Sequence, residues 1–164
     1  MSALNPYVDF LDGRPIRGIL AATPAVIAGL IESMGPAKTA AVPAPGKWSA
    51  AEIICHLADC ELVFGFRLRQ TLAEEDHVIQ PFDQEKWSAR YPGILANHAL
   101  DVFAAMRGWN LQLMQKALPQ AATKTVTHPE RGTMTFQTIL ETKAGHDLNH
   151  LRQLQKLAST TPAK

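Results

Sequence analysis

Four long segments of this 164-residue chain repeat their apolar residues at spacings of three and four, and turn residues separate the segments. Such spacing places the apolar side chains on one stripe of an α-helix. Helices with one apolar stripe bury it best against each other, so the pattern predicts an all-α fold, a four-helix bundle. The expected helical segments are 14–35, 48–73, 95–118 and 135–158. The inward stripe expected on the third is Ala99, Val102, Met106, Trp109 and Leu113.

Capping and breaking residues mark the expected helix ends. Ser49 and Glu52 form a capping box, in which the hydroxyl and the carboxylate each accept a hydrogen bond from an otherwise unpaired backbone amide. Thr135 is expected to cap the last helix. Pro24 is expected to divide the first segment into a short and a longer helix, which ends at Gly35.

Two connections interrupt the helical pattern. Residues 74–93 contain Pro81 and Pro92 around a polar centre, which predicts a long connection with one short helical turn. This length allows a crossover between the second and third helices. Residues 122–135 alternate threonine and valine around a turn at Pro129, which predicts a small hairpin.

Composition narrows the class of protein. Hydrophobic residues make up 46% and charged residues 19%, values typical of a globular chain. The net charge is +1 and the basic residues are scattered, so neither nucleic acid nor an anionic membrane is an expected partner. No signal peptide and no uninterrupted apolar run of ~20 residues is expected. Cys55 and Cys60 are badly placed for a disulfide. These features predict one cytoplasmic domain over residues 1–164.

Three histidines are the candidate metal ligands. In "GHDLNH", His146 and His150 are four residues apart, so both project from one face of the last helix. This face is the inward one, because it also carries Ile139 and Leu157. His56 faces inward from the second helix, and three imidazoles can bind one divalent ion. Three protein ligands leave a position open for water or a thiolate, as in catalytic sites, and no side chain is assigned as catalytic beyond that.

Several alternatives stay open at this point. Each inward histidine could be a hydrogen-bonded core residue instead of a ligand. Cys60 could be a soft ligand or a small buried hydrophobe. Asp59 and Asp147 could orient imidazoles from outside the ligand set, or lie on a solvated helix edge.

A substrate pocket is expected beside these histidines. Arg67 and Lys143 share the histidine stripes and could meet an anionic substrate, or could extend past the core edge into solvent. Phe82, Asp83 and Trp87 could line the mouth of the pocket, or pack within the long connection. The remaining histidines, His77, His98 and His128, are expected on the surface, with His128 as a spare ligand.

Four blocks of sequence resemble the DinB/YfiT-like superfamily of metal-binding four-helix bundles. They are "PAPGKWSAAEIICHLADCELVFGFRLR", "IQPFDQEKW", "HPERGTMT" and "AGHDLNHLRQL", in that order, and the resemblance spans nearly the whole chain. It implies that His56, His146 and His150 hold a divalent ion, nickel or zinc, near one end of the bundle.

The resemblance also implies a range of activities. Relatives include transferases that join a low-molecular-weight thiol, such as bacillithiol or mycothiol, to an electrophile, and proteins named metal-dependent hydrolases. Members are often homodimers, and the family name does not imply DNA binding. We therefore expect a metal-dependent thiol S-transferase acting on a small molecule. The alternatives are a metal-dependent hydrolase and a non-enzymatic stress-response or binding protein that the metal stabilises.

Overall fold

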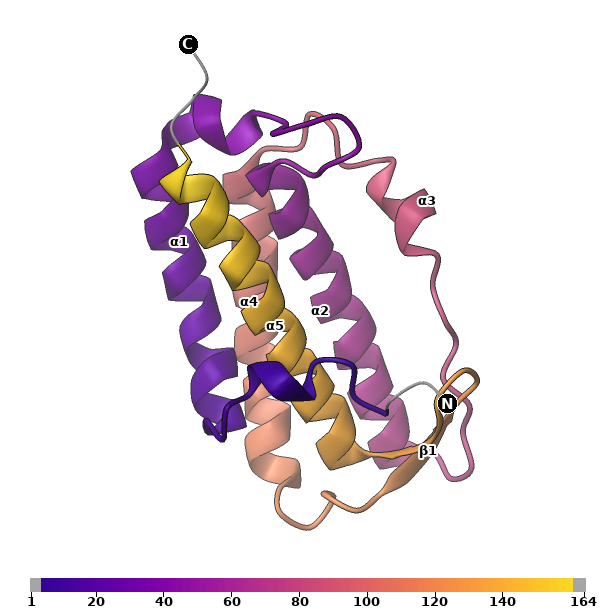
Figure 1. The fold of residues 1–164 in the computed structure, drawn as a ribbon. Helices are drawn as coiled ribbons and strands as arrows, with labels where there is room; N and C mark the ends of the chain where they lie inside the picture. Colours follow the sequence, from indigo (N-terminus) through magenta and orange to yellow (C-terminus); the bar gives the residue numbers. More distant parts are fainter. Residues whose placement is uncertain (1–3, 161–164) are drawn as a thin grey trace.

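Four long helices form the bundle in the computed structural model, which describes residues 4–160 (Figure 1). Their bounds are α1 Ile16–Ala40, α2 Ala50–Ala73, α4 Ala96–Ala117 and α5 Phe136–Ser159. Four short elements accompany them: a 3₁₀ helix η1 (Val8–Phe10), α3 (Gln84–Ser88), and the strands β1 (Thr125–His128) and β2 (Gly132–Thr135). The all-α expectation is confirmed, because the sheet is only two short strands.

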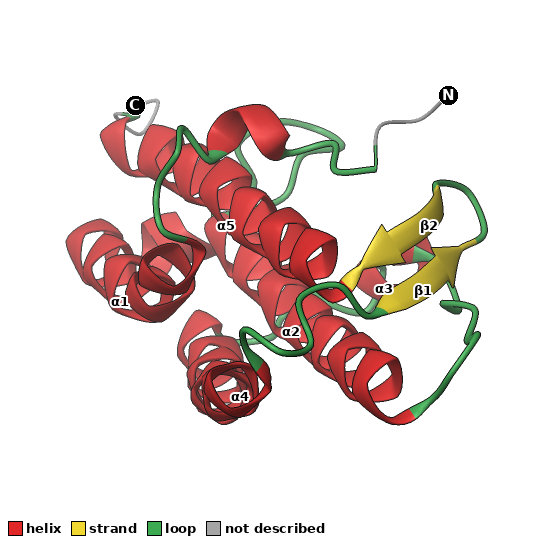
Figure 2. Ribbon diagram, turned by 90° about the horizontal axis from the view of Figure 1, so that it is seen from below, coloured by secondary structure: helices red, strands yellow, loops and turns green. Residues whose placement is uncertain are grey.

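The order of the helices includes a crossover. In Figure 1, α1 and α5 run in one direction and α2 and α4 in the other. The connection after α2, which carries α3, returns along the outside of the bundle, so that α4 starts beside the start of α2. Figure 2 shows the result end-on, with α2 next to α4 and α5, and the hairpin outside the bundle. The long connection therefore determines which helices are neighbours.

The hairpin and the long connection form one wall beside α2 and α5. The strands pair antiparallel, with Val126 opposite Met134, and both of these side chains are buried. Val78 of the connection forms a parallel bridge with Thr127, through backbone hydrogen bonds that Ile79 and Thr127 donate. These bonds fix the connection against the hairpin and so position the residues that follow in the chain.

The expected caps are present. The Ser49 hydroxyl accepts from the Glu52 amide, and the Glu52 carboxylate accepts from the Ser49 amide at 2.7 Å. Thr135 accepts from the Thr138 amide at the start of α5. In the connection, Asp83 caps α3 by accepting from the Lys86 amide. Each cap satisfies a backbone donor that the first turn of a helix leaves unpaired.

The first helix differs from the prediction, because α1 continues through Pro24 and departs from helical geometry only at Gly35, whose φ is 70°. A proline at position 24 cannot donate to the carbonyl of Leu20, four residues earlier. The Arg107 guanidinium donates to this carbonyl at 2.7 Å instead. A side chain from α4 therefore replaces the hydrogen bond that the proline removes, and the helix does not break there.

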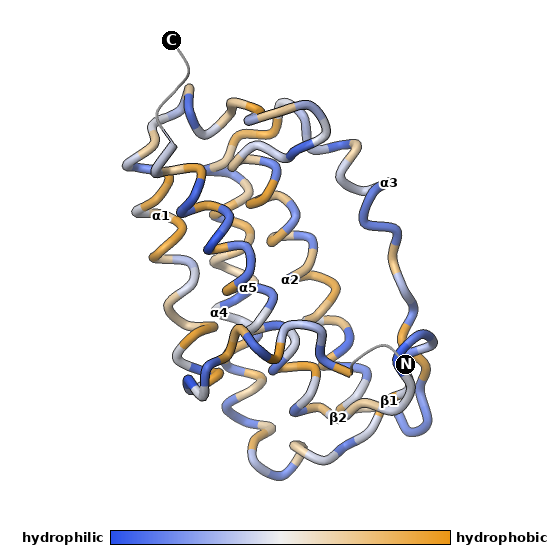
Figure 3. The backbone as a smooth tube through the Cα atoms, viewed as in Figure 1, coloured by the Kyte–Doolittle hydropathy of each residue, from blue (hydrophilic) through white to orange (hydrophobic). Residues whose placement is uncertain are grey.

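The apolar character of α1 also differs from the prediction. By length and composition alone, Ile16–Ala40 could cross a membrane, since an 18-residue window has a mean hydropathy of 1.5. The sequence-based prediction considered only uninterrupted apolar runs and so did not anticipate this candidate. In this structure α1 packs on α4 and α5, and Leu20 and Ile27 are completely buried. Figure 3 shows apolar and polar segments alternating along the other helices.

The inward face of α4 is only partly the predicted one, because Ala99 is buried as expected but most of the expected stripe is not. Val102 and Trp109 are 52% and 68% exposed, whereas Phe103, Arg107 and Asn110 are buried. The prediction followed apolar residues alone, and two polar residues occupy core positions on this helix. The face is therefore rotated by one residue from the expected stripe.

Candidate metal centre

Three imidazoles converge between α2 and α5. The Nε2 atom of His146 lies 3.0 Å from that of His56 and 3.1 Å from that of His150. Two nitrogens that each lie ~2.1 Å from one ion would be roughly 3.0–3.4 Å apart at bond angles of 90–109°. One potential ligand atom from each of the three residues lies within 4.8 Å of the others. The donor set and its spacing therefore fit a divalent metal ion.

The imidazoles are in the neutral form that binds metal. Burial, followed by the neighbouring His150, lowers the pKa of His56 to about 3. Burial, together with the two other imidazoles, lowers the pKa of His146 well below its usual value. The pKa of His150 is also lowered, mainly by burial. Near pH 7 the three side chains therefore need not lose protons before they coordinate.

One residue outside the triad sets the orientation of a ligand. The Nδ1 atom of His150 lies 3.0 Å from Oε1 of Gln153, and an amide oxygen can only accept. Nδ1 therefore carries the proton, and the lone pair of Nε2 points toward the other imidazoles. Gln153 was not predicted, although its position three residues after His150 on one helix face is a signal that could have found it.

Aromatic rings enclose the triad. The Tyr7 ring, from the segment before η1, lies edge-on 5.4 Å from the His146 ring, and the Trp48 ring lies 4.9 Å from the His56 ring. Tyr7 can approach because α5 has Gly145 at this point. A Cβ atom there would lie 2.6 Å from the carbonyl oxygen of Tyr7. These rings limit the access of bulk water to the ligand atoms.

The two aspartates expected beside the ligands have other partners. The Asp59 carboxylate accepts from the Tyr91 hydroxyl at 2.7 Å. The Asp147 carboxylate accepts from two nitrogens of Arg107, at 2.7 and 3.1 Å. No hydrogen bond joins either aspartate to the triad within residues 4–160. Asp147 does not lie on a solvated edge, since it is 2% exposed, whereas Asp59 is partly exposed.

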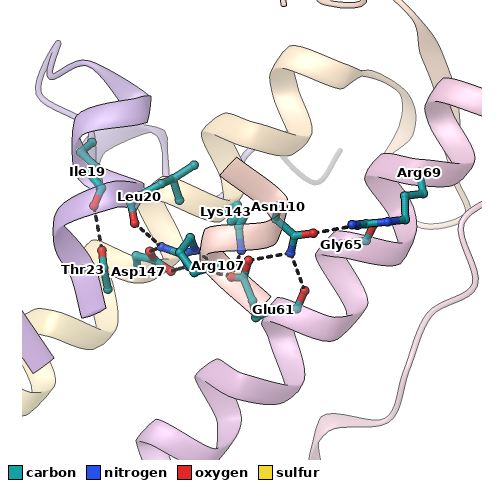
Figure 4. Close-up of polar contacts among 10 residues, drawn as sticks. All are labelled: Ile19, Leu20, Thr23, Glu61, Gly65, Arg69, Arg107, Asn110, Lys143 and Asp147. Carbon is teal, nitrogen blue, oxygen red and sulfur yellow. Dashed lines mark hydrogen bonds and ion pairs between the residues drawn. The ribbon is translucent and has the colours of Figure 1, made fainter. Parts of the chain in front are cut away.

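A buried ionic cluster lies beside the triad, made of Glu61, Arg107, Lys143 and Asp147, with Asn110 at its edge (Figure 4). Glu61 accepts from Arg107 at 2.9 Å and from Lys143. Lys143 is only 1% exposed, so it neither reaches a substrate pocket nor extends into solvent. Both interpretations of Lys143 from the sequence are therefore wrong, and Glu61, Arg107 and Asn110 were not anticipated.

Cys60 contacts the triad from the next turn of α2. Its Sγ lies 3.4 Å from Nε2 of His56, and Cys55 and Cys60 are both free thiols. Burial raises the pKa of the Cys60 thiol to about 12, so the thiol is protonated near pH 7. Cys60 does not belong to the group whose ligand atoms converge. This agrees with its interpretation as a small buried side chain.

Of the other residues expected at the pocket, some line a cavity and others have different contacts. Arg67 and Phe82 line a cavity of about 110 Å³ next to His146. Trp87 packs against the Phe82 ring at 4.9 Å, and Asp83 is used as the cap of α3. His128 lines the same cavity instead of joining the triad. His98 is exposed as expected, whereas His77 and His128 are buried, at 8% and 7% exposure.

Comparison with known proteins identifies the family. The model of the DinB superfamily matches residues 19–154, and the chain belongs to this superfamily. A Bacillus subtilis protein, YfiT, is 22% identical over 143 residues, or 85% of this chain and 80% of its own length. Its solved structure has a TM-score of 0.80 at 21% identity, covers 87% of this chain and 83% of its own, and is described as an unusual four-helix bundle topology.

Other relatives carry similar names. A protein of Oceanobacillus iheyensis is 27% identical over 113 residues, which is 68% of this chain and 66% of that protein, just under two thirds of its length. One of Bacillus mycoides is 23% identical over 116 residues, covering 68% of this chain and 65% of its own. These proteins and YfiT are named as candidate metal-dependent hydrolases.

Proposed function

We propose that this protein is a metal-dependent enzyme that transfers a low-molecular-weight thiol, of the bacillithiol or mycothiol class, to a small electrophile. The observation that carries the proposal is that two cavities meet at the triad. One is the 110 Å³ cavity, and the other has a volume of about 640 Å³. His146, Tyr7 and Gln84 line both. Two such spaces give room for a thiol and an electrophile on either side of the triad.

The triad and its surroundings suit this chemistry. A divalent ion held by His56, His146 and His150 would supply a Lewis acid that lowers the pKa of a thiol or a water. We propose nickel or zinc, since both accept imidazole nitrogen. Gln153 keeps the lone pair of His150 directed inward. Tyr7 and Trp48 pack against His146 and His56 and reduce the contact of these imidazoles with water, which strengthens electrostatic interactions at the reacting centre.

Hydrolysis is the second candidate, and the names of the relatives favour it. The same ion would activate water in place of a thiol. A third candidate is a non-enzymatic role, in which the metal joins α2 to α5 and so stabilises a stress-response protein. In each case we propose a cytoplasmic location, in agreement with the free thiols of Cys55 and Cys60.

Metal analysis and a substrate panel test the proposal together. Wild-type protein is expected to bind about one divalent ion per triad, and His150→Ala to retain less than a tenth of it, because two imidazoles and no third ligand remain. His98→Ala is the matched control, because His98 is exposed on α4 and outside the triad. Unchanged metal content in His150→Ala would contradict the assignment of the ligands.

The dependence of turnover on metal and on thiol distinguishes the transferase from the hydrolase. With metal present, consumption of an electrophile is expected to depend on added thiol and to produce a thioether. Turnover that needs metal but no thiol would replace the transferase with the hydrolase. A large rise in melting temperature on adding metal, without turnover in either assay, would favour the non-enzymatic role.

A further inference from the structure

The smaller cavity beside the triad has basic side chains but no acidic ones. His146 and Cys60 form part of its wall on the side of the triad, and Arg67, His128 and Arg131 form another part. Neither Arg67 nor Arg131 has a carboxylate within 4.0 Å in the part of the chain that the structure describes. The cavity therefore holds two guanidinium charges that the protein itself does not neutralise.

Arg67 has donor capacity that its neighbours leave unused. Its Nη2 donates to the carbonyl of Gln80 at 3.3 Å. Its Nε is buried and has no hydrogen-bond partner among residues 4–160. A buried donor without a partner is costly, and such groups in native proteins are commonly satisfied by a ligand or ordered water. Arg67 lines the cavity, so this unused donor capacity lies at the cavity wall.

Two further donors come from the hairpin, which lies far from Arg67 in the sequence. Arg131 lies in the turn between β1 and β2, and His128 is the last residue of β1. The Nδ1 atom of His128 accepts from the Glu130 amide at 3.2 Å, so the proton of the neutral ring is on Nε2. Burial lowers the pKa of His128, and the two arginines lower it further, which favours this neutral form.

The other side chains that line the cavity indicate which class of anion fits. They are mainly apolar and include Phe64, Ile79, Phe82 and Met134. An inorganic anion would leave these side chains without a partner, whereas an organic acid has a hydrocarbon part that can contact them. A carboxylate is planar and can accept two parallel hydrogen bonds from a guanidinium group. The volume of about 110 Å³ suits a small molecule.

We propose that this cavity is a carboxylate-binding subsite, in which Arg67, Arg131 and His128 hold the acid group of a small organic substrate beside the metal triad. The proposal builds on the function proposed above and narrows the electrophile to a carboxylic acid. The larger cavity, which Lys47 and Lys156 line, then remains for the second substrate.

Binding of matched acids and amides tests the subsite without turnover. The probes are butyrate and benzoate, their amides, and inorganic phosphate, titrated into the metal-loaded protein and followed by NMR. Both acids are expected to bind at least 10-fold more tightly than their amides. Arg67→Gln and Arg131→Gln are each expected to weaken binding of the acids by about 10- to 100-fold, the range for a lost charge-assisted contact. Arg90→Gln is the control, because Arg90 is exposed. The affinity of this variant for the acids should match that of wild type.

The outcomes separate this subsite from the proposed reaction. Equal binding of acids and amides, tighter binding of phosphate than of either acid, or unchanged affinity in both arginine variants would each overturn the subsite. If Arg67→Gln fails to fold, Arg131→Gln still tests the subsite, because Arg131 lies in a turn outside the helical core. Acid-selective binding that depends on both arginines, in a protein that shows no metal-dependent turnover, would support the subsite and contradict the enzyme.

Discussion

Glu61 is the residue on which the buried ionic cluster depends. It is completely buried and accepts from Arg107, Lys143 and Asn110, which come from two other helices. Burial alone would raise the pKa of this carboxyl, but Lys143 and Arg107 lower it more, so that the pKa is about 2. A charge in the interior is tolerated only when opposite charges and hydrogen bonds surround it, as they do here.

We predict that Glu61→Gln lowers the free energy of unfolding by about 3 kcal/mol, because it leaves buried cations without their shared anion. Urea denaturation at pH 7 measures the change. Glu32→Gln is the matched control, because Glu32 is exposed and should change stability by less than about 0.5 kcal/mol. An equal effect of the two substitutions would show that the cluster contributes little.

The pH dependence of this difference follows from the lowered pKa. The charged form of Glu61 stabilises the folded state fully above the usual carboxyl pKa of 4.5. As the pH falls from about 4.5 toward 2, the unfolded chain takes up a proton that folded Glu61 does not, and this stabilisation is lost. The stability difference between wild type and Glu61→Gln should therefore shrink over this interval. A difference that is constant with pH would contradict the role of the charge.

The segment before η1 packs against α5 beside the histidine triad, and this contact depends on Gly145. A Cβ at position 145 would lie 2.6 Å from both the Cβ and the carbonyl oxygen of Tyr7. The oxygen is backbone and cannot rotate away, so the segment must move. Alanine favours a helix over glycine by up to ~1 kcal/mol, and the steric conflict opposes this gain.

We predict that Gly145→Ala displaces Tyr7 from His146 and exposes the N-terminal segment, with no gain in stability. Limited proteolysis should cleave before η1 several-fold faster than in wild type. Gly108→Ala is the control, because nothing lies within 4 Å of the Cβ position there and the helix should gain about 0.5–1 kcal/mol. Equal stabilisation by both substitutions, with unchanged cleavage, would show that the segment does not depend on Gly145.

The helices and the triad could be predicted from sequence for related reasons. Apolar spacing, the Ser49 cap and the HxxxH pair are local signals, and they place His146 and His150 on the inward face before any packing is known. The bundle then brings His56 to them. The ionic cluster could not be found this way, since Glu61 and Arg107 are residue types that are mostly exposed. Only the pairing of α2 with α4 and α5 shows that they are buried together.

On the outside of the bundle, α2 and α4 present exposed apolar side chains. Leu62 and Phe66 on α2 are 53% and 58% exposed, and Val102 and Trp109 on α4 are 52% and 68% exposed. The two helices are neighbours, and Arg69 of α2 lies over the Trp109 ring at 6.0 Å. Exposed apolar groups of this size, gathered on adjacent helices, are typical of protein interfaces.

We predict that this face joins two copies of the chain, because exposed apolar side chains of this size are stabilised when a second copy covers them. Light scattering should give twice the chain mass of 17.9 kDa for wild type, and the single mass for the double variant Phe66→Ser and Trp109→Ser. Val26→Ser is the control, because Val26 is exposed on α1 and should leave the mass unchanged. Both substituted residues project away from the core, so the variant should keep its helical content. A wild-type mass of 17.9 kDa, or a double variant that remains dimeric, would contradict this interface.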